Sequence, residues 1–306
     1  MSPAYNENIP NSYEAPLRSE QEMLDLILSV ARADERIRAV VLNGSRANPN
    51  APRDLLQDFD IIYLVRGSSA PFRADLDWIG QFGELMILQL PEEMGDPPPS
   101  GNYDAVYLAQ FMDGNRIDLS VYPLERWPEL KNDSLSVLLL DKDGAIGALP
   151  PASEASYLPT PPDAKAFADC CNEFWWVSPY AAKGLWRREL PYAKATLDEN
   201  VRAQLMKMLR WQIGIQTGFK INPGKEGKYF ERYLPPEQWA LLLRTYADAD
   251  YSRNWDALEA MGALFRQAAC FVAEHYGFDY PAGEDERVSA FLRRIRALPP
   301  GAKTLD

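Results

Sequence analysis

Two carboxylates stand two residues apart where a strongly apolar run begins, because Asp58 and Asp60 flank Phe59 at the start of DFDIIYLV. Alternate side chains of a β-strand face the same way, so both carboxylates project from one face, about 7 Å apart, while Phe59 and Ile61 point to the other. Like charges this close on a half-buried surface disfavour each other's ionisation. Hard cations such as Mg²⁺ bind carboxylate oxygens and keep places open for substrate phosphates, so the pair predicts a metal site at a strand end.

A Gly-Ser turn precedes this pair. Gly44 and Ser45 follow the apolar run AVVLN, so a predicted strand enters a tight turn that offers backbone N–H groups and a hydroxyl. Such a turn can hold an anion. Arg46 comes next, either as a charge partner for that anion or as a surface arginine beside a loop. No segment matches G-x-x-x-x-G-K-[ST], and NPGKEGKY fails the same test, so a P-loop is excluded.

A third carboxylate, Asp118, lies in the predicted strand NRIDLSVY. The order of strand, Gly44-Ser45 turn, Asp58-x-Asp60 strand and third acidic strand resembles the nucleotidyltransferase superfamily of the DNA polymerase β type. In that superfamily the Gly-Ser turn holds the triphosphate of the nucleotide, and the three carboxylates bind Mg²⁺. The alternative interpretation is structural, with the aspartate pair a solvated strand end and Asp118 a hairpin residue.

These residues need a sheet to position them, and the first half of the chain supplies its strands. Residues 19–36 keep apolar positions at helical spacing after Ser19, which predicts one amphipathic helix. At least four strands follow, and the last two form a hairpin turned at Asp113-Gly114-Asn115. Segment 91–102, PEEMGDPPPSGN, predicts a loop. Segment 149–163, rich in proline and small residues, predicts an interdomain connection.

The second half changes from a period of two to a period near 3.6, which predicts a bundle of helices. One of the expected helix starts is at Ser178, where a capping residue precedes Pro179. We therefore expect an α+β protein of two domains. Residues 1–155 would form a nucleotidyltransferase domain, a mixed twisted sheet with flanking helices, and residues 156–306 a helical substrate-binding bundle.

Composition and charge limit the kinds of molecule that this protein is expected to bind. The chain has 306 residues, 46% of them apolar, and a formal charge of −12, which argues against a nucleic-acid surface and suits a cationic ligand. No apolar run is long enough to span a membrane and the N-terminus lacks a secretory pattern, so we expect a cytoplasmic protein without a membrane partner. The three cysteines imply no disulfide framework, and the single histidine, His275, suits a helix end better than catalysis. We expect a monomer or a weak homodimer.

Four longer segments narrow the resemblance to one family within this superfamily. The segments are LNGSRANPNAPRDLLQDFDIIYLV in the first half, and CNEFWWVSPYAAKGLWRRELPYAK, LRWQIGIQTGFKINPGKEGKYFERYL and YPAGEDERVSAFLRRIRAL in the second. Over residues 20–298 the chain resembles the aminoglycoside 6-adenylyltransferases. Membership would imply transfer of AMP from Mg-ATP to a hydroxyl, the 6-position of the streptidine ring, of streptomycin, with release of pyrophosphate and resistance to the antibiotic. The alternatives are another small-molecule hydroxyl, a protein acceptor, or a catalytically idle nucleotide-binding homologue.

The resemblance also assigns roles to the three aspartates. Asp58 and Asp60 would hold the Mg²⁺ that chelates the triphosphate, and all three carboxylates would share a second Mg²⁺, so that two ions stabilise the attacking and leaving oxygens. Asp118 could be a metal ligand or the general base that accepts the hydroxyl proton. In similar enzymes the acidic residue at this strand position is given the base role. Gly44, Ser45 and the amides around them would hold the phosphates.

Further candidates lie in the predicted bundle. Lys183 would add positive charge for the nucleotide, or belong to a solvated basic stripe. Lys225 and Lys228 sit in the glycine-flanked GKEGK loop, where similar enzymes place a lysine against the triphosphate.

A polycationic substrate needs carboxylates and flat aromatic surfaces. The segment DCCNEFWWVSPY supplies both, and helical spacing places Asp169, Glu173 and Trp176 on one face. Tyr180 completes the candidates for substrate binding. The alternative for the tryptophans is the core of the bundle.

Overall fold

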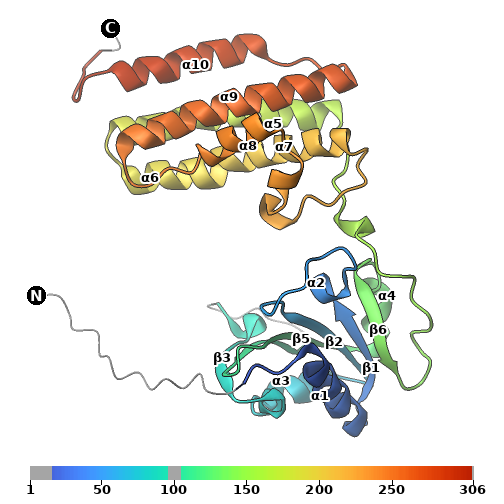
Figure 1. Ribbon diagram of the computed structural model, residues 1–306. Coiled ribbons are helices and arrows are strands. Elements are labelled where there is room, and N and C mark those ends of the chain that lie inside the picture. Colours follow the sequence, from blue (N-terminus) through green and yellow to red (C-terminus); the bar gives the residue numbers. More distant parts are fainter. Residues whose placement is uncertain (1–15, 96–104, 305–306) are drawn as a thin grey trace, which may run out of the picture. The chain divides into compact units, whose positions relative to one another are not determined.

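The computed structural model describes residues 16–95 and 105–304 (Figure 1). The chain divides into two compact units, the first ending at Ser156 and the second beginning at Tyr157. The first holds a mixed sheet with helices and the second is helical, so the α+β class is confirmed. Part of the loop expected at 91–102 lies outside the described residues.

A six-stranded sheet in the order β3-β4-β5-β2-β1-β6 forms the first unit. Strands β2 and β5 are parallel and the other neighbours are antiparallel, which makes the sheet mixed. The predicted hairpin is confirmed as β4 and β5. Strand β6 was not among the predicted strands. The strand bounds are β1 Ile37–Asn43, β2 Phe59–Val65, β3 Leu85–Gln89, β4 Ala105–Phe111, β5 Arg116–Pro123 and β6 Ser136–Asp141.

The helices of this unit are α1 Glu20–Ala33, α2 Gly44–Ala47, α3 Ala70–Ala74 and α4 Trp127–Leu130. Helix α1 is the predicted amphipathic helix, and Ser19 caps it in a reciprocal capping box with Glu22. Its buried residues, Ile27 among them, belong to the main apolar cluster with one face of the sheet. The hydroxyl of Tyr63 donates to the carbonyl of Ile27 at 2.6 Å, which fixes α1 on β2.

The opposite face of the sheet carries a smaller apolar cluster built on Ala39, Val41, Leu64 and Trp127. Strand alternation assigns even-numbered residues of β2 to this face, because Ile62 and Leu64 pack here whereas Phe59 and Ile61 join the main core. On this face the first residue of β2 is Asp60, which is acidic where Ile62 and Leu64 are apolar. The candidate site residues are grouped around it.

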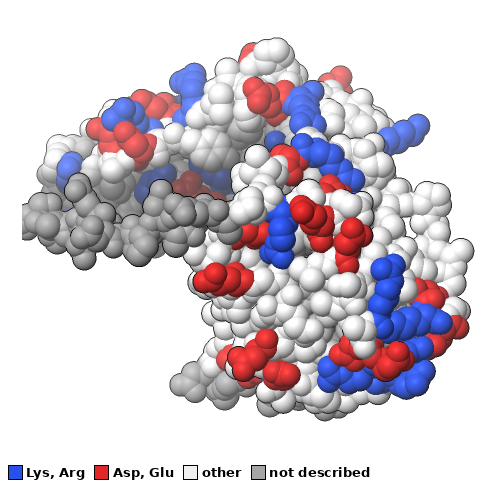
Figure 2. All heavy atoms as spheres, turned by 60° about the horizontal axis from the view of Figure 1, so that its bottom comes forward, with Lys and Arg blue, Asp and Glu red and all other residues white. Residues whose placement is uncertain are grey.

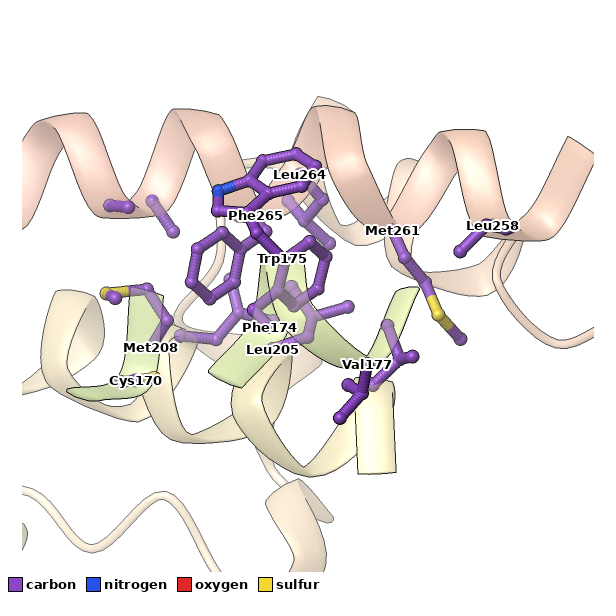
Figure 3. Close-up of a cluster of buried hydrophobic side chains, with 14 of the residues drawn as sticks. Cys170, Phe174, Trp175, Val177, Leu205, Met208, Leu258, Met261, Leu264 and Phe265 are labelled. Atoms are coloured by element: carbon purple, nitrogen blue, oxygen red, sulfur yellow. The ribbon is translucent and has the colours of Figure 1, made fainter. Parts of the chain in front are cut away.

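The second unit consists of α5 Ala164–Trp186, α6 Leu190–Ala195, α7 Arg202–Gln216, α8 Pro236–Leu243, α9 Tyr251–Tyr276 and α10 Ala282–Ala297. Figure 3 shows the side chains of Phe174 and Trp175 of α5 against Phe265 of α9. The rings of Phe174 and Phe265 stack with their centroids 3.8 Å apart. The expected helical bundle is confirmed, and His275 lies in the last turn of α9 before Gly277, which has left-handed backbone.

One expected helix start is wrong. Helix α5 runs through Pro179 without ending, so Ser178 is not a cap. A proline here removes one backbone donor from the ladder, and a helix tolerates this when its tertiary packing is strong. The hydroxyl of Ser178 donates back to the carbonyl of Phe174 at 2.7 Å, a bond typical of serine inside a helix. The tightly packed aromatic residues of α5 therefore override a local stop signal.

Charge is distributed without a continuous basic surface on the face drawn in Figure 2, where lysines and arginines lie singly or in small groups beside acidic residues. Within residues 16–95 and 105–304, no helix is long and apolar enough to cross a membrane. The three cysteines are free.

Candidate active site

A polar row crosses the sheet at the start of β2. In the pairing of β1, β2 and β5, Asn43 is opposite Asp60, and Asp60 is opposite Asp118. Residues paired across neighbouring strands project from the same face, so these three side chains stand side by side. Asp58 lies one residue before β2 and adds a third carboxylate to the row. The parallel pairing of β2 with β5 thus brings together acids that are far apart in sequence.

The backbone after β1 makes a close approach to Asp60. Gly44 has a φ of +69°, a conformation that favours glycine, and a Cβ at this position would lie 2.1 Å from Oδ2 of Asp60. The expected tight turn is in fact the four-residue helix α2, which begins at Gly44. Ser45 is half-buried in it, and its hydroxyl accepts a hydrogen bond from Nε2 of Gln57 at 3.3 Å. Gly44 and Ser45 therefore lie next to the carboxylates, as a phosphate-binding turn beside a metal site would.

Asn43 holds the end of β1, and the sequence interpretation missed it. Its Nδ2 donates to Oγ of Ser136 at 2.8 Å and to Oδ2 of Asp133 at 3.2 Å. Its Oδ1 is buried without a hydrogen-bond partner among the described residues, so one acceptor remains for a ligand or a water. A polar residue at the last position of a buried strand, directly before Gly44, is the signal that could have identified it.

The carboxylates disfavour each other's charge. Burial, followed by the charges of Asp118 and Asp58, raises the pKa of Asp60 to about 6. Burial also raises the pKa of Asp58, and the charge of Asp118 acts in the same direction, while Arg116 opposes it. A site with three acids in mutual repulsion favours the binding of a cation.

Arg116 is a second residue that the sequence interpretation missed. Its Nε donates to Oδ1 of Asp118 at 2.7 Å and its Nη2 donates to Oδ2 at 2.8 Å, a bidentate pair. The same Nε lies 3.7 Å from Oδ2 of Asp58. Arg116 and Asp118 are two residues apart on one strand and so share a face, which is the sequence signal for the pair.

The donor set fits a magnesium ion by its chemistry, since carboxylate oxygens are the ligands that Mg²⁺ prefers. Residues that could hold it are Asp58, Asp60 and Asp118. Among the described residues, however, no three acidic, histidine or cysteine side chains are arranged closely enough to hold a metal ion. The guanidinium of Arg116 contacts two of these carboxylates, those of Asp118 and Asp58.

The second unit contains a pocket of about 470 Å³ on helices α5 and α10. Three of the predicted residues, Trp176, Tyr180 and Lys183, line it. Trp176 is 63% exposed, and Nζ of Lys183 lies 5.4 Å from the centre of the Tyr180 ring. The other lining residues are Asn172, Trp175, Pro179, Glu284, Arg287 and Val288. An aromatic wall with charged groups of both signs suits a flat polar ligand.

A family model described as streptomycin adenylyltransferase matches residues 17–295. The matched span contains the glycine-serine turn, the three aspartates and most of both units. The chain belongs to the streptomycin adenylyltransferase family. The resemblance seen in the sequence is thereby confirmed, and so is the enzyme class, a nucleotidyltransferase.

Curated relatives cover nearly the whole chain. A protein named aminoglycoside 6-adenylyltransferase from Bacillus subtilis (strain 168) is 40% identical over 282 residues, which cover 91% of this chain and 98% of that protein. Another of the same name from Campylobacter jejuni is 40% identical over 279 residues, covering 91% and 96%. A crystal structure of an aminoglycoside 6-adenyltransferase from Bacillus subtilis matches with 36% identity and a TM-score of 0.46, covering 92% of this chain and all 100% of that one.

In this streptomycin adenylyltransferase family member, Arg46 does not occupy the place expected for a phosphate-binding residue. Its side chain is buried, with Nη1 3.0 Å from Oε2 of Glu20. Its Nε and Nη2 donate to the carbonyls of Asp58 and Gln57, and its guanidinium lies 3.8 Å from the centre of the Phe59 ring. Burial lowers its pKa. The structure corrects the expectation, because Arg46 positions the backbone before β2 and its donors are directed into the protein.

Asp169 and Glu173 do not line the pocket beside Trp176. Both are exposed, and Asp169 pairs with Lys165 in the preceding turn. Along α5 the pocket is lined by Asn172, Trp176 and Tyr180, and the role of Asp169 and Glu173 in substrate binding stays a prediction. The acid that does line the pocket, Glu284, comes from α10 and was not predicted.

The GKEGK loop is exposed at both Lys225 and Lys228. Lys225 begins a short 3₁₀ turn, Lys225–Gly227, and Lys228 follows it with Nζ 5.1 Å from the centre of the Tyr229 ring. Glu226 between them has a φ of +52°. Lys183, which was grouped with these lysines, lies instead in the pocket with the aromatic residues.

Proposed function

We propose that this family member transfers AMP from Mg-ATP to the 6-hydroxyl of the streptidine ring of streptomycin and releases pyrophosphate. The observation that supports this most directly is the pairing of Asp60 with Asp118 across β2 and β5, next to the Gly44 turn. The relatives at 40% identity carry the name aminoglycoside 6-adenylyltransferase. Asp58, Asp60 and Asp118 would hold two Mg²⁺ ions, which would stabilise the attacking and leaving oxygens at the α-phosphorus.

The residues around the acids would bind and orient the nucleotide. The amides at the start of α2 and the hydroxyl of Ser45 would donate to the triphosphate, because Gly44 allows them to approach the carboxylates. Lys225 or Lys228, both accessible in their loop, would neutralise the outer phosphates. Holding the phosphates beside Asp118 would direct the acceptor hydroxyl towards the α-phosphorus.

The helical unit would bind the acceptor. Trp176 and Tyr180 offer flat aromatic surfaces in the pocket, and Glu284 offers a carboxylate for a guanidinium group of streptomycin. Asp169 and Glu173 remain exposed acids on the neighbouring face of α5, where they would contribute long-range attraction to a polycation.

The first experiment measures pyrophosphate release from ATP and Mg²⁺ with streptomycin, kanamycin, spectinomycin or lincomycin, and without an acceptor. Release with streptomycin alone is the expected result. Release with a different compound would show that this compound, and not streptomycin, is the acceptor, and the proposed nucleotidyltransferase site would stand. Release with none of them would contradict the proposed acceptor class.

Asp118→Asn separates the two roles of this residue. We expect turnover to fall by at least about 100-fold in either role. If Asp118 is the general base, the affinity of the variant for Mg-ATP, measured by calorimetry, stays within about twofold of that of the unchanged protein. If Asp118 is a metal ligand, its loss weakens this affinity strongly. Near-normal turnover of the variant would contradict both roles.

A further inference from the structure

The guanidinium of Arg116 occupies the acidic site of the first unit. It donates to both carboxylate oxygens of Asp118, at 2.7 and 2.8 Å, and its Nε is 3.7 Å from Oδ2 of Asp58. The Arg116 side chain is 39% exposed, so it can leave the site without disturbing the core. A guanidinium that is bound to carboxylates and is also open to solvent can be replaced there by another cation.

The other nearby arginine cannot take this place. Arg46 is buried, and its donors are directed to Glu20 and to the carbonyls of Gln57 and Asp58. Arg46 acts on the Asp58 carboxylate only through its charge. Arg116 therefore supplies the close positive charge at Asp118 and Asp58, and it acts on Asp60 through its charge alone.

A metal ion and the guanidinium would compete for the same carboxylates. Charges of like sign repel strongly at the separation of two cations bound to one carboxylate. Both Asp118 oxygens already accept charge-assisted hydrogen bonds, which are about twice as strong as neutral ones. This competition agrees with the finding that the described residues form no ready metal cluster.

We propose that Arg116 is a resident counter-cation, which metal binding displaces from Asp118, and that its hold on this carboxylate sets the metal affinity of the site. Arg116 is thus a positioning residue that neutralises the acids before the substrate complex forms. The inference rests on the proposed metal site, and it adds a residue that weakens the binding of metal ions to that site. It requires that removal of Arg116 strengthens metal binding, the opposite of what loss of a merely structural residue would do.

The test measures Mn²⁺ binding by electron paramagnetic resonance at pH 8 without nucleotide. We expect Arg116→Gln to bind Mn²⁺ about fivefold more tightly than the unchanged protein, the factor that corresponds to an ion pair of about 1 kcal/mol. Arg116→Lys keeps the charge but loses the two-pronged contact, and it should lie between the two. Arg36→Gln, which removes the ion pair of Arg36 with Asp34 at the other end of β1, is the matched control and should leave Mn²⁺ binding unchanged.

Asp60→Asn identifies the binding that belongs to this site. If the unchanged protein binds Mn²⁺ in a manner that Asp60→Asn abolishes, but Arg116→Gln binds equally or more weakly, the counter-cation role is overturned and the metal site stands. If neither the unchanged protein nor Arg116→Gln shows such binding, both are overturned. Circular dichroism checks that Arg116→Gln is folded, and should it fail to fold, the intermediate affinity of Arg116→Lys decides the question.

Discussion

At the scale of single residues, the site brings together charges that repel one another. Asp60 lies close to two other acids, and Gly44 readily adopts the left-handed backbone that approaches the Asp60 carboxylate. Arrangements of this kind persist only where the surrounding structure fixes them. Here β1 and β2 fix them, since Gly44 directly follows β1 and Asp60 lies within β2.

Asp60→Asn should stabilise the metal-free protein at pH 7. Burial, followed by the charges of Asp118 and Asp58, raises the pKa of Asp60 to about 6 from an ordinary value of 3.8. The folded state keeps this proton to a higher pH than the unfolded state, so stability falls as the pH rises from about 4 to about 6 and stays lower above it. The amide escapes this loss, and the expected gain is roughly 1–3 kcal/mol at pH 7.

Urea denaturation in the presence of a chelator at pH 7 and at pH 4 measures this effect. The gain from Asp60→Asn should shrink towards zero at pH 4, where the carboxyl of the unchanged protein is protonated in the folded state. A gain of the same size at both pH values would contradict the pKa argument.

Gly44→Ala should impair both stability and turnover. The new Cβ would meet the Asp60 carboxylate at 2.1 Å and the backbone would keep a φ of +69°. We expect a loss of about 1–3 kcal/mol in the free energy of unfolding and at least about a tenfold loss of turnover, because the acid must move. Thermal denaturation and pyrophosphate release measure the two.

Gly67→Ala is the matched control for this prediction. Gly67 has a φ of +76°, and a Cβ added there would meet nothing within 4 Å, so the variant carries the backbone strain alone. It should destabilise the protein by about 1 kcal/mol and leave turnover unchanged. Equal loss of turnover in both variants would show that the contact with Asp60 has no part in the effect.

At the scale of elements, helix α5 carries two neighbouring tryptophans with different environments. Trp175 is 2% exposed and packs against Phe265, whereas Trp176 is 63% exposed and lines the pocket. Consecutive residues of a helix point about 100° apart, so one indole faces the core while the next faces solvent. Both residues line the pocket, but Trp175 does so as part of the core, whereas Trp176 offers it an exposed ring.

Trp175→Ala should lower the free energy of unfolding by about 3–5 kcal/mol, the usual effect of emptying a large core site. Trp176→Ala should change it by less than about 0.5 kcal/mol, because little of this side chain is buried. In acceptor kinetics, Trp176→Ala should raise KM for streptomycin. Unchanged KM in this variant would remove Trp176 from the proposed acceptor site.

At the scale of the whole molecule, each unit has its own apolar core. A unit with a separate core can unfold as a separate cooperative transition. We expect calorimetry to resolve two transitions, with Gly44→Ala lowering the melting temperature of one and Trp175→Ala that of the other. A single transition that both variants shift would contradict independent unfolding.

The sequence predicts which face of a strand or helix a residue occupies better than it predicts which polar side chains pair with one another. Strand alternation places Asp58 and Asp60 on one face, and the spacing after Ser19 locates α1. The same pattern cannot say that Arg116 folds back on Asp118 while Arg46 turns inward to Glu20, because a repeat of apolar positions carries no information about which polar side chains meet. Such choices belong to the tertiary structure, as does the passage of α5 through Pro179.

The pocket on α5 and α10 also gives the protein an optical reporter. Trp176 is the tryptophan with a large exposed fraction among the eight in the chain, at 63%. A water-soluble quencher such as acrylamide therefore reaches chiefly one indole, at the mouth of the pocket. A molecule that binds in the pocket and covers this ring should protect it from the quencher. Pocket occupancy can therefore be followed by the tryptophan fluorescence of the protein without a label.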